Sequence, residues 1–297
     1  MNELLMVCER IAPELMTVLK DRYKLLSHLA YEEPLGRRSL AAATDISERA
    51  VRSHVDALRG NGLVEISKPG IYLSAEGRDL VPKLRGILHE YERVGELEQQ
   101  LKHALHIDDV IITPSEGSLM LKRLGFTAAK VVQRMVTDSS VVAVSGGSTM
   151  YYIAGKANET FGYGKDVTIT PIRGGLSVVN TEYQANDIAS RMAKNSGHSS
   201  QLLHAPDNIG QKALEELKKE PVVKNALDVI GKTSIIIHSI GNAFEMAYRR
   251  KSSKDILKVL EEKKAVCESF GSYFDESGSE IFKTSTIGMS FKDVNGI

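Results

Sequence analysis

RRSLAAATDISERAVRSHVDALRGNGLVEISKPGIYL, at residues 37–73, holds the pattern from which the first domain can be predicted. Residues 37–44 predict a short helix, and a tight turn follows it. Ser47 is a preferred N-cap residue, so a second helix is expected over 48–60. One face of this helix is polar and expected to be exposed. Its other face is apolar, with Val51, Val55 and Leu58.

Two short alternating runs follow on either side of a Pro-Gly turn, and they predict a β-hairpin over 63–74. Residues 4–31 carry apolar residues at helical spacing, with Pro13 expected in the first turn of a helix. This order of elements is typical of a winged helix-turn-helix, whose second helix must be apolar behind and polar in front to enter a major groove. The alternative is a small helical domain whose arginines only solvate its surface.

The residues expected to contact DNA lie on the polar face of the second helix and in the hairpin. The helix candidates for base-edge or phosphate contacts are Ser47, Arg49, Arg52, Ser53 and His54. Lys68 in the hairpin is expected to touch the DNA backbone. Lys plus Arg equals Asp plus Glu, 38 each, so the net charge neither indicates nor excludes nucleic-acid binding.

Length and composition are those of a globular protein, and 297 residues suggest about two domains. The two cysteines, Cys8 and Cys267, argue against a disulfide scaffold and against a cysteine-based zinc site. No run of about 18 apolar residues and no basic N-terminal segment occurs, so neither a membrane span nor a signal peptide is expected. We therefore expect a cytoplasmic protein.

The rest of the chain predicts a doubly wound α/β domain with a parallel sheet, because short apolar runs alternate with helical segments. The expected strands are 110–112, 141–144, 167–170, 202–203 and 234–237. The expected helices are 118–137, 148–157, 184–195, 210–219 and 253–263. The predicted organisation is a DNA-binding domain over 1–80, a linker helix over 81–105 and an effector-binding domain over 106–297. The linker helix either packs on its own domain or pairs with its twin in a dimer.

Glycine-rich loops follow two of the expected strands, where ligands of open α/β sheets bind. Ser145-Gly146-Gly147-Ser148-Thr149 would offer free N–H groups and two hydroxyls to a phosphate at a helix start. Arg173-Gly174-Gly175 adds a guanidinium that can bind phosphate with two hydrogen bonds. The alternatives are ordinary strand–helix connections and a surface ion pair for the arginine. No acidic pair, nucleophile–base pair or metal-ligand cluster stands out.

Several further motifs complete a resemblance to a known family. They are Pro-Ile-Arg-Gly-Gly-Leu at 171–176, Tyr-Gln-Ala-Asn at 183–186, Ile-Gly-Asn-Ala at 240–243, Tyr-Arg-Arg at 248–250 and Glu-Ser-Phe-Gly-Ser-Tyr-Phe at 268–274. With the winged helix-turn-helix, nearly the whole chain resembles the SorC family of sugar-phosphate-responsive transcriptional regulators. The resemblance implies a sensor domain similar to sugar-phosphate isomerases and deaminases that lost catalysis. It also implies fructose 1,6-bisphosphate as the effector.

The resemblance also implies which residues bind the effector. They are Gly146, Gly147, Ser148, Thr149, Arg173, Gln184, Arg249 and Glu268. Ser148 stands where the family commonly has threonine, and it keeps the hydroxyl. Chains of the family continue into another strand and a lysine-containing loop, so the last strand and helix are expected to be missing here. Weaker effector binding and an exposed sheet edge are then expected.

The expected function is a repressor of glycolytic genes that binds operator DNA, senses a phosphorylated sugar and forms a homo-oligomer. No catalytic residue, metal, cofactor or membrane partner is expected. One alternative is a sugar-phosphate isomerase or deaminase with an appended helical domain, although the matching positions offer only Glu268 as a base. The other alternative is a metabolite-binding scaffold with no role at DNA.

Overall fold

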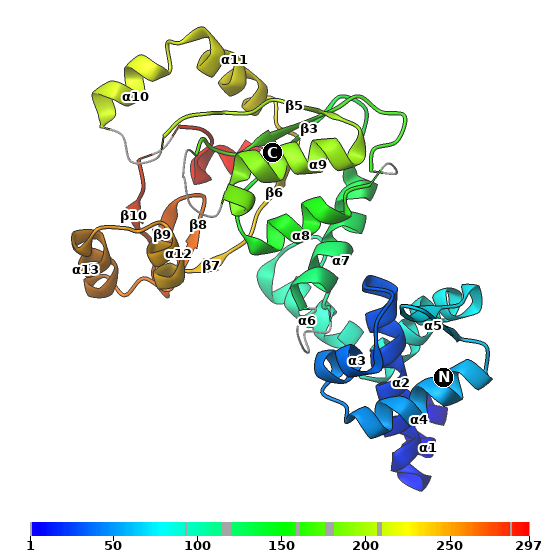
Figure 1. Ribbon diagram of the computed structural model, residues 1–297. Coiled ribbons are helices and arrows are strands. Elements are labelled where there is room, and N and C mark those ends of the chain that lie inside the picture. The colour runs from blue at the N-terminus through cyan, green and yellow to red at the C-terminus, as the bar shows by residue number, and fades with distance from the viewer. Residues whose placement is uncertain are drawn as a thin grey trace. The chain divides into compact units, whose positions relative to one another are not determined.

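A computed structural model describes residues 2–92, 94–113, 120–158, 161–175, 181–206, 210–285 and 287–296. The chain forms two compact units, Met1–Arg123 and Leu124–Ile297 (Figure 1). The residues expected to form a linker, 81–105, thus fall inside the first unit. Among the described residues, no helix has both the length and the apolar character that crossing a membrane requires.

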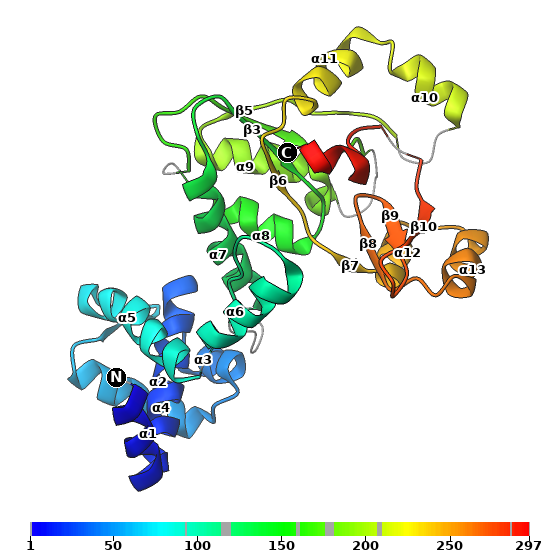
Figure 2. The ribbon, with the colours of Figure 1, turned by 180° about the vertical axis from the view of Figure 1, so that it is seen from behind.

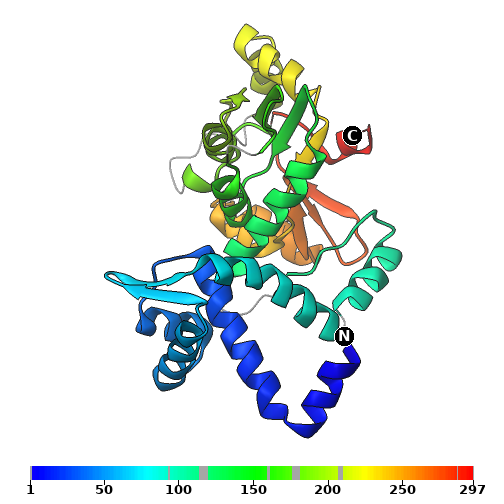
Figure 3. The same ribbon diagram turned by 90° about the vertical axis from the view of Figure 1, so that its right-hand side faces the viewer.

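The first unit is helical with one hairpin. Its elements are α1 (Asn2–Ile11), α2 (Pro13–Tyr31), α3 (Arg37–Thr44), α4 (Glu48–Gly60), β1 (Val64–Ser67), β2 (Gly70–Leu73), α5 (Ala75–Tyr91) and α6 (Val94–Leu105). Pro13 occupies the first turn of α2, as expected. The strands β1 and β2 pair antiparallel, with Val64 opposite Leu73, and the hairpin projects from the helices of this unit (Figure 3).

The core of the first unit holds α4 by its apolar face. Leu25, Leu26 and Leu29 of α2 are buried together with Val51 and Val55 of α4. The Ser47 side chain accepts a hydrogen bond from the Ala50 N–H at 3.3 Å, which satisfies one donor at the start of α4. The structure therefore contains the predicted helix-turn-helix and its hairpin.

The single linker helix expected over 81–105 is instead parts of two helices. Helix α5 ends at Tyr91 and α6 begins at Val94, and Gly95 lowers the helix propensity at this point. Glu98 of α6 pairs with His89 at 3.3 Å and accepts the Ile112 N–H at 2.7 Å. Residues 110–112 are therefore held against α6 and do not form the expected strand.

A parallel sheet forms the centre of the second unit. It consists of β3 (Ser140–Val144), β4 (Val167–Pro171), β5 (Ser199–Ser200) and β6 (Ile235–Ile237), in the order β5-β4-β3-β6. Three of these strands match the predictions. The expected strand at 202–203 is replaced by β5, and Leu203 is buried beyond that strand.

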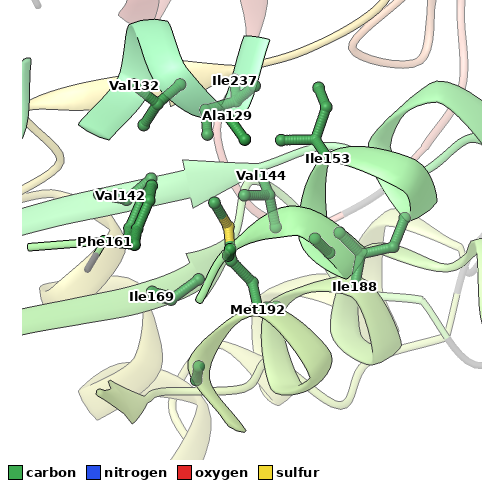
Figure 4. Packing of buried hydrophobic residues seen from close by; sticks show 14 of the residues in the cluster. Ala129, Val132, Val142, Val144, Ile153, Phe161, Ile169, Ile188, Met192 and Ile237 are labelled. Atoms are coloured by element: carbon green, nitrogen blue, oxygen red, sulfur yellow. The ribbon is translucent and has the colours of Figure 1, made fainter. Parts of the chain in front are cut away.

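Helices cover both faces of this sheet (Figure 1). They are α7 (Met120–Met135), α8 (Ser148–Lys156), α9 (Ala185–Ser196), α10 (Gln211–Leu217) and α11 (Pro221–Ile230), with short 3-10 turns at Thr181–Tyr183 and Phe291–Gly296. Val142 and Val144 pack on one face with residues of α7, α8 and α9 (Figure 4). Ala143 packs on the other face with residues of α11. The domain is doubly wound, as predicted.

A second, antiparallel sheet was not predicted. It contains β7 (Gly241–Asn242), β8 (Cys267–Ser269), β9 (Ser272–Phe274) and β10 (Glu280–Lys283), in the order β10-β9-β8-β7. Helices α12 (Ala243–Arg249) and α13 (Lys254–Glu262) accompany it (Figure 2). Buried Tyr273 and Leu260 lie in its core.

We expect Leu25→Ala to lower the free energy of unfolding by about 2–5 kcal/mol, because it leaves a cavity beneath α4. Leu15→Ala is the matched control, since Leu15 is 56% exposed while Leu25 is 0% exposed. Urea denaturation followed by circular dichroism measures both variants. Equal losses in the two variants would contradict this description of the core.

Candidate functional site

The sheet order creates a switch point between β3 and β6. The chain leaves β3 toward β4 on one side and returns to β6 on the other, and such points are where open α/β sheets bind ligands. The loops after β3 and β6 meet there. The Ser145 N–H donates to the Ile237 carbonyl at 3.0 Å, and Ser239 Oγ lies 3.3 Å from where a Cβ on Gly147 would stand.

The glycines after β3 are required by close approaches. A Cβ on Gly146 would lie 2.8 Å from the Tyr183 carbonyl oxygen, so only glycine fits. Gly147 has φ +125° and precedes α8 with no side chain capping the helix. Ser148 and Thr149 are half-buried in the first turn, and their hydroxyls have no hydrogen bond to any described residue.

The Arg173 loop is held in place from two sides. The Gly174 N–H donates to the Ile287 carbonyl at 2.8 Å, and Arg173 forms a bridge with Gly288. On the other side, buried Asn186 donates to the Gly175 carbonyl at 3.2 Å and to the Leu203 carbonyl at 2.9 Å, and its oxygen accepts the Leu203 N–H. Gln184 also reaches this loop, because its Oε1 lies 3.3 Å from the Cβ position of Gly175.

Glu268 lies in an ion pair with Arg250. Its Oε1 accepts from Arg250 Nη2 at 2.8 Å and from the Gly271 N–H at 2.6 Å. The Glu268 side chain is 5% exposed and that of Arg250 is 20% exposed, so the pair is largely buried. Arg250 Nη1 is buried without a hydrogen-bond partner.

Arg249, which the resemblance implied, takes no part in these contacts among the described residues. Its side chain is 54% exposed and stands 4.0 Å from Glu245, one helical turn away. Sequence reasoning missed Arg250, its neighbour in the Tyr-Arg-Arg motif. Close approaches link Gly146 to Tyr183, Gly175 to Gln184, and Gly271 to both Arg173 and Glu268. The name strand-end cluster is used below for Gly146–Thr149, Arg173, Gln184, Arg250 and Glu268.

The phenol of Tyr273 lies near the charged side chains of this cluster. Burial raises the pKa of its phenol; Arg250 opposes that rise, Glu268 adds to it, and Arg173 opposes it. A Cβ on Gly271 would also collide with the Arg173 guanidinium. Arg173, Arg250 and Glu268 therefore lie around one buried ring.

This arrangement suits anion recognition better than proton transfer. The start of α8 presents N–H groups and two hydroxyls, and Arg173 and Arg250 are cationic. Glu268 Oε1 already accepts hydrogen bonds from Arg250 and the Gly271 N–H, so this oxygen is engaged in holding the arginine and the turn. In the part of the chain that the structure describes, no group of three potential ligands could hold a metal ion.

All but one of the predicted DNA-contacting residues are exposed. Ser47, Arg49, Arg52 and Ser53 are exposed along α4, and Lys68 is exposed in the hairpin turn. His54 is not part of that face, because its Nε2 lies 3.6 Å from Asp21 Oδ2 of α2 and its side chain is only 13% exposed. Base contact by His54 is therefore not supported by its position.

We expect Glu268→Gln to lower the free energy of unfolding by about 2–5 kcal/mol, because it leaves Arg250 buried without its carboxylate. Glu245→Gln is the control, since it breaks an exposed pair with an arginine and should cost at most about 0.5 kcal/mol. Chemical denaturation of both variants measures the difference. A loss for Glu268→Gln no larger than the control would show that the pair contributes nothing.

Comparisons with known proteins agree with both units. The model of the CggR N-terminal DNA binding domain matches residues 18–88, and the Sugar-bind family model matches residues 89–297. The chain is 32% identical to the central glycolytic genes regulator of Bacillus subtilis (strain 168), across 100% of this chain and 88% of that protein.

Two solved structures carry the same fold. A SorC family transcriptional regulator from Enterococcus faecalis is 28% identical with a TM-score of 0.62, and the match covers 68% of this chain and 83% of that one. The full-length sorbitol operon regulator SorC from Klebsiella pneumoniae is 17% identical with a TM-score of 0.62, covering 92% and 85%. The second match shows the fold alone.

These findings confirm the predicted fold class and a regulator rather than an enzyme. A DNA-binding domain matches at the front and a sugar-binding domain behind it. The chain belongs to the SorC family of transcriptional regulators.

Proposed function

We propose that this chain is a cytoplasmic repressor of glycolytic genes that binds operator DNA and is controlled by fructose 1,6-bisphosphate. The strand-end cluster carries the proposal. It offers two separate places for anionic groups, the N-terminus of α8 and the Arg173–Arg250 side, as a ligand with two phosphates requires. The name of the Bacillus subtilis relative supports glycolytic genes as the target.

The charges of the cluster favour a doubly anionic ligand. Among its described residues, two guanidiniums, Arg173 and Arg250, face one carboxylate, Glu268. A second phosphate group could accept hydrogen bonds from a guanidinium on this side of the cluster. A sugar monophosphate held at α8 would occupy only one of the two proposed places. Arg250 takes the role that the resemblance gave to Arg249.

The exposed face of α4 is proposed to read the operator. Arg52 and Ser53 follow Arg49 by three and four residues, so they project from the same side of the helix as Arg49. Because a single such helix covers one half-site, we propose a homo-oligomer on a symmetric operator. No cofactor is involved. Binding of sugar and DNA is linked reciprocally, so a sugar that weakens operator binding is itself bound more weakly by the DNA-bound form.

We expect fructose 1,6-bisphosphate to stabilise the chain by about 2.7 kcal/mol at a hundredfold excess over Kd. Thermal unfolding measures the shift, with fructose 6-phosphate and inorganic phosphate as controls. Arg173→Ala and Arg250→Met should abolish the shift, because each removes a cation from the anion site. Arg249→Met, the adjacent exposed arginine, should keep it.

Three results would count against this assignment. Equal shifts with fructose 6-phosphate would remove the argument for two phosphates. Loss of the shift in Arg249→Met but not in Arg250→Met would restore the arginine that the resemblance implied. Turnover of fructose 6-phosphate or glucosamine 6-phosphate would favour the isomerase or deaminase alternative.

We expect Arg52→Ala to weaken operator binding and to reduce the slope of log K against log salt by about one unit, because one phosphate contact is lost. Fluorescence anisotropy at several salt concentrations measures this, with a duplex selected by the wild-type chain from a randomised pool. Lys232→Ala, an exposed charge of the sensor unit, is the control. An unchanged slope in Arg52→Ala would exclude Arg52 from the DNA interface.

A further inference from the structure

Helix α7 belongs to both units of the chain. The boundary falls between Arg123 and Leu124, inside the helix that runs over Met120–Met135. Within the first unit, Lys122 and Arg123 contact α2. Within the second unit, Gly125 and the residues after it contact α8 and the core. Polar side-chain contacts hold the first turn of the helix, and close backbone packing holds the part that follows.

Arg123 anchors the first turn of α7 on α2, but it does so weakly. The side chain is buried, its Nη2 lies 3.2 Å from His28 Nδ1, and its guanidinium stands over the Tyr31 ring at 5.8 Å. Its Nε is buried without a hydrogen bond, and no carboxylate of the described residues forms an ion pair with it. A buried cation without a carboxylate partner is poorly compensated.

The hydrogen bond from Arg123 also competes with another. His28 Nδ1 lies 2.8 Å from the Lys24 carbonyl oxygen, to which it can only donate. A ring nitrogen that donates its proton cannot at the same time accept from Arg123. One of these two contacts is therefore always incomplete, and the docking of Arg123 is correspondingly weak.

The sequence of this turn adds to its marginal stability. It contains Lys122 and Arg123 and no acidic residue, whereas the N-terminus of a helix favours negative charge. An ion pair between Lys122 Nζ and Glu32 Oε2 of α2, at 2.7 Å, offsets part of this unfavourable positive charge. The helical state of the turn thus depends on α2, which in turn packs on α4 through Leu26 and its neighbours.

Two residues further along, α7 is tightly bound to the sensor unit. A Cβ on Gly125 would lie 2.7 Å from the Tyr152 carbonyl carbon and 2.9 Å from the Ile153 nitrogen, so the helices α7 and α8 touch backbone to backbone. Ile153 is only about a turn and a half from Ser148, where α8 begins. After Gly125, Ala129 and Val132 of α7 enter the core of the sensor unit (Figure 4).

We propose that the first turn of α7 is the element that couples effector binding to DNA binding. A ligand held at the start of α8 shifts the contact at Gly125. The packed side of α7 follows α8, and the weakly held Arg123 is released from α2. The release alters the support of α4, the helix proposed to read DNA. The inference rests on the proposed function.

Amide hydrogen exchange of the wild-type chain tests the local step. Addition of fructose 1,6-bisphosphate is expected to accelerate exchange at residues 121–125 by about fivefold or more, within the usual range of allosteric coupling. The buried amides of β3 should exchange no faster, because the bound sugar stabilises the folded sensor unit. Unaltered or slower exchange at 121–125, with the sugar demonstrably bound, would overturn the proposal.

Arg123→Met tests the coupling, because it removes the guanidinium and keeps an apolar chain of similar length. In the wild type, the bisphosphate should weaken binding to the selected duplex by about 5–150-fold. In Arg123→Met the effect should fall below about twofold, since docking no longer depends on this cation. Arg134→Met, an exposed arginine of the same helix, should respond like the wild type.

The outcomes separate this proposal from the function on which it rests. A wild-type chain that binds no DNA, or responds to no sugar, would contradict the proposed function. A wild-type response retained in full by Arg123→Met would contradict only the coupling through α7. If Arg123→Met does not fold, the exchange measurement on the wild type decides alone.

Discussion

The need to bury β3 on both faces organises the sensor unit. All five of its residues are buried, so helices must cover the sheet above and below. The parallel register with β4 and β6 makes the loops after all three strands leave at one edge. The glycine loop, the Arg173 loop and Ser239 meet there for that reason. The strand-end cluster is thus a consequence of how the apolar strands are buried.

Elements whose burial leaves a regular pattern could be predicted from the sequence. The apolar runs of β3, β4 and β6 and the amphipathic face of α4 are such patterns, and the structure confirms them. The antiparallel sheet could not be predicted, because its strands have two to four residues and show no periodicity. The same holds for β5, which is formed by two serines.

The candidate site also has parts that could be predicted from the sequence and parts that could not. The glycines after β3 predict the loop before α8, because a close approach between two backbone segments requires glycine. The choice between Arg249 and Arg250 depends on how α12 packs, with Ala243 and Ala247 inward, and no local pattern reveals that. His54 is similar: it is withdrawn from the exposed face by Asp21, a residue of another helix that only the tertiary fold brings near.

The buried pair of Glu268 and Arg250 explains how a sensor can be both ordered and responsive. Its desolvation costs stability, but it fixes the arginine before any ligand arrives, so little conformational entropy is lost on binding. Under the proposed function, an anion bound beside this arginine stabilises the folded chain as it binds. Ligand affinity and stability would then depend on the same buried ion pair.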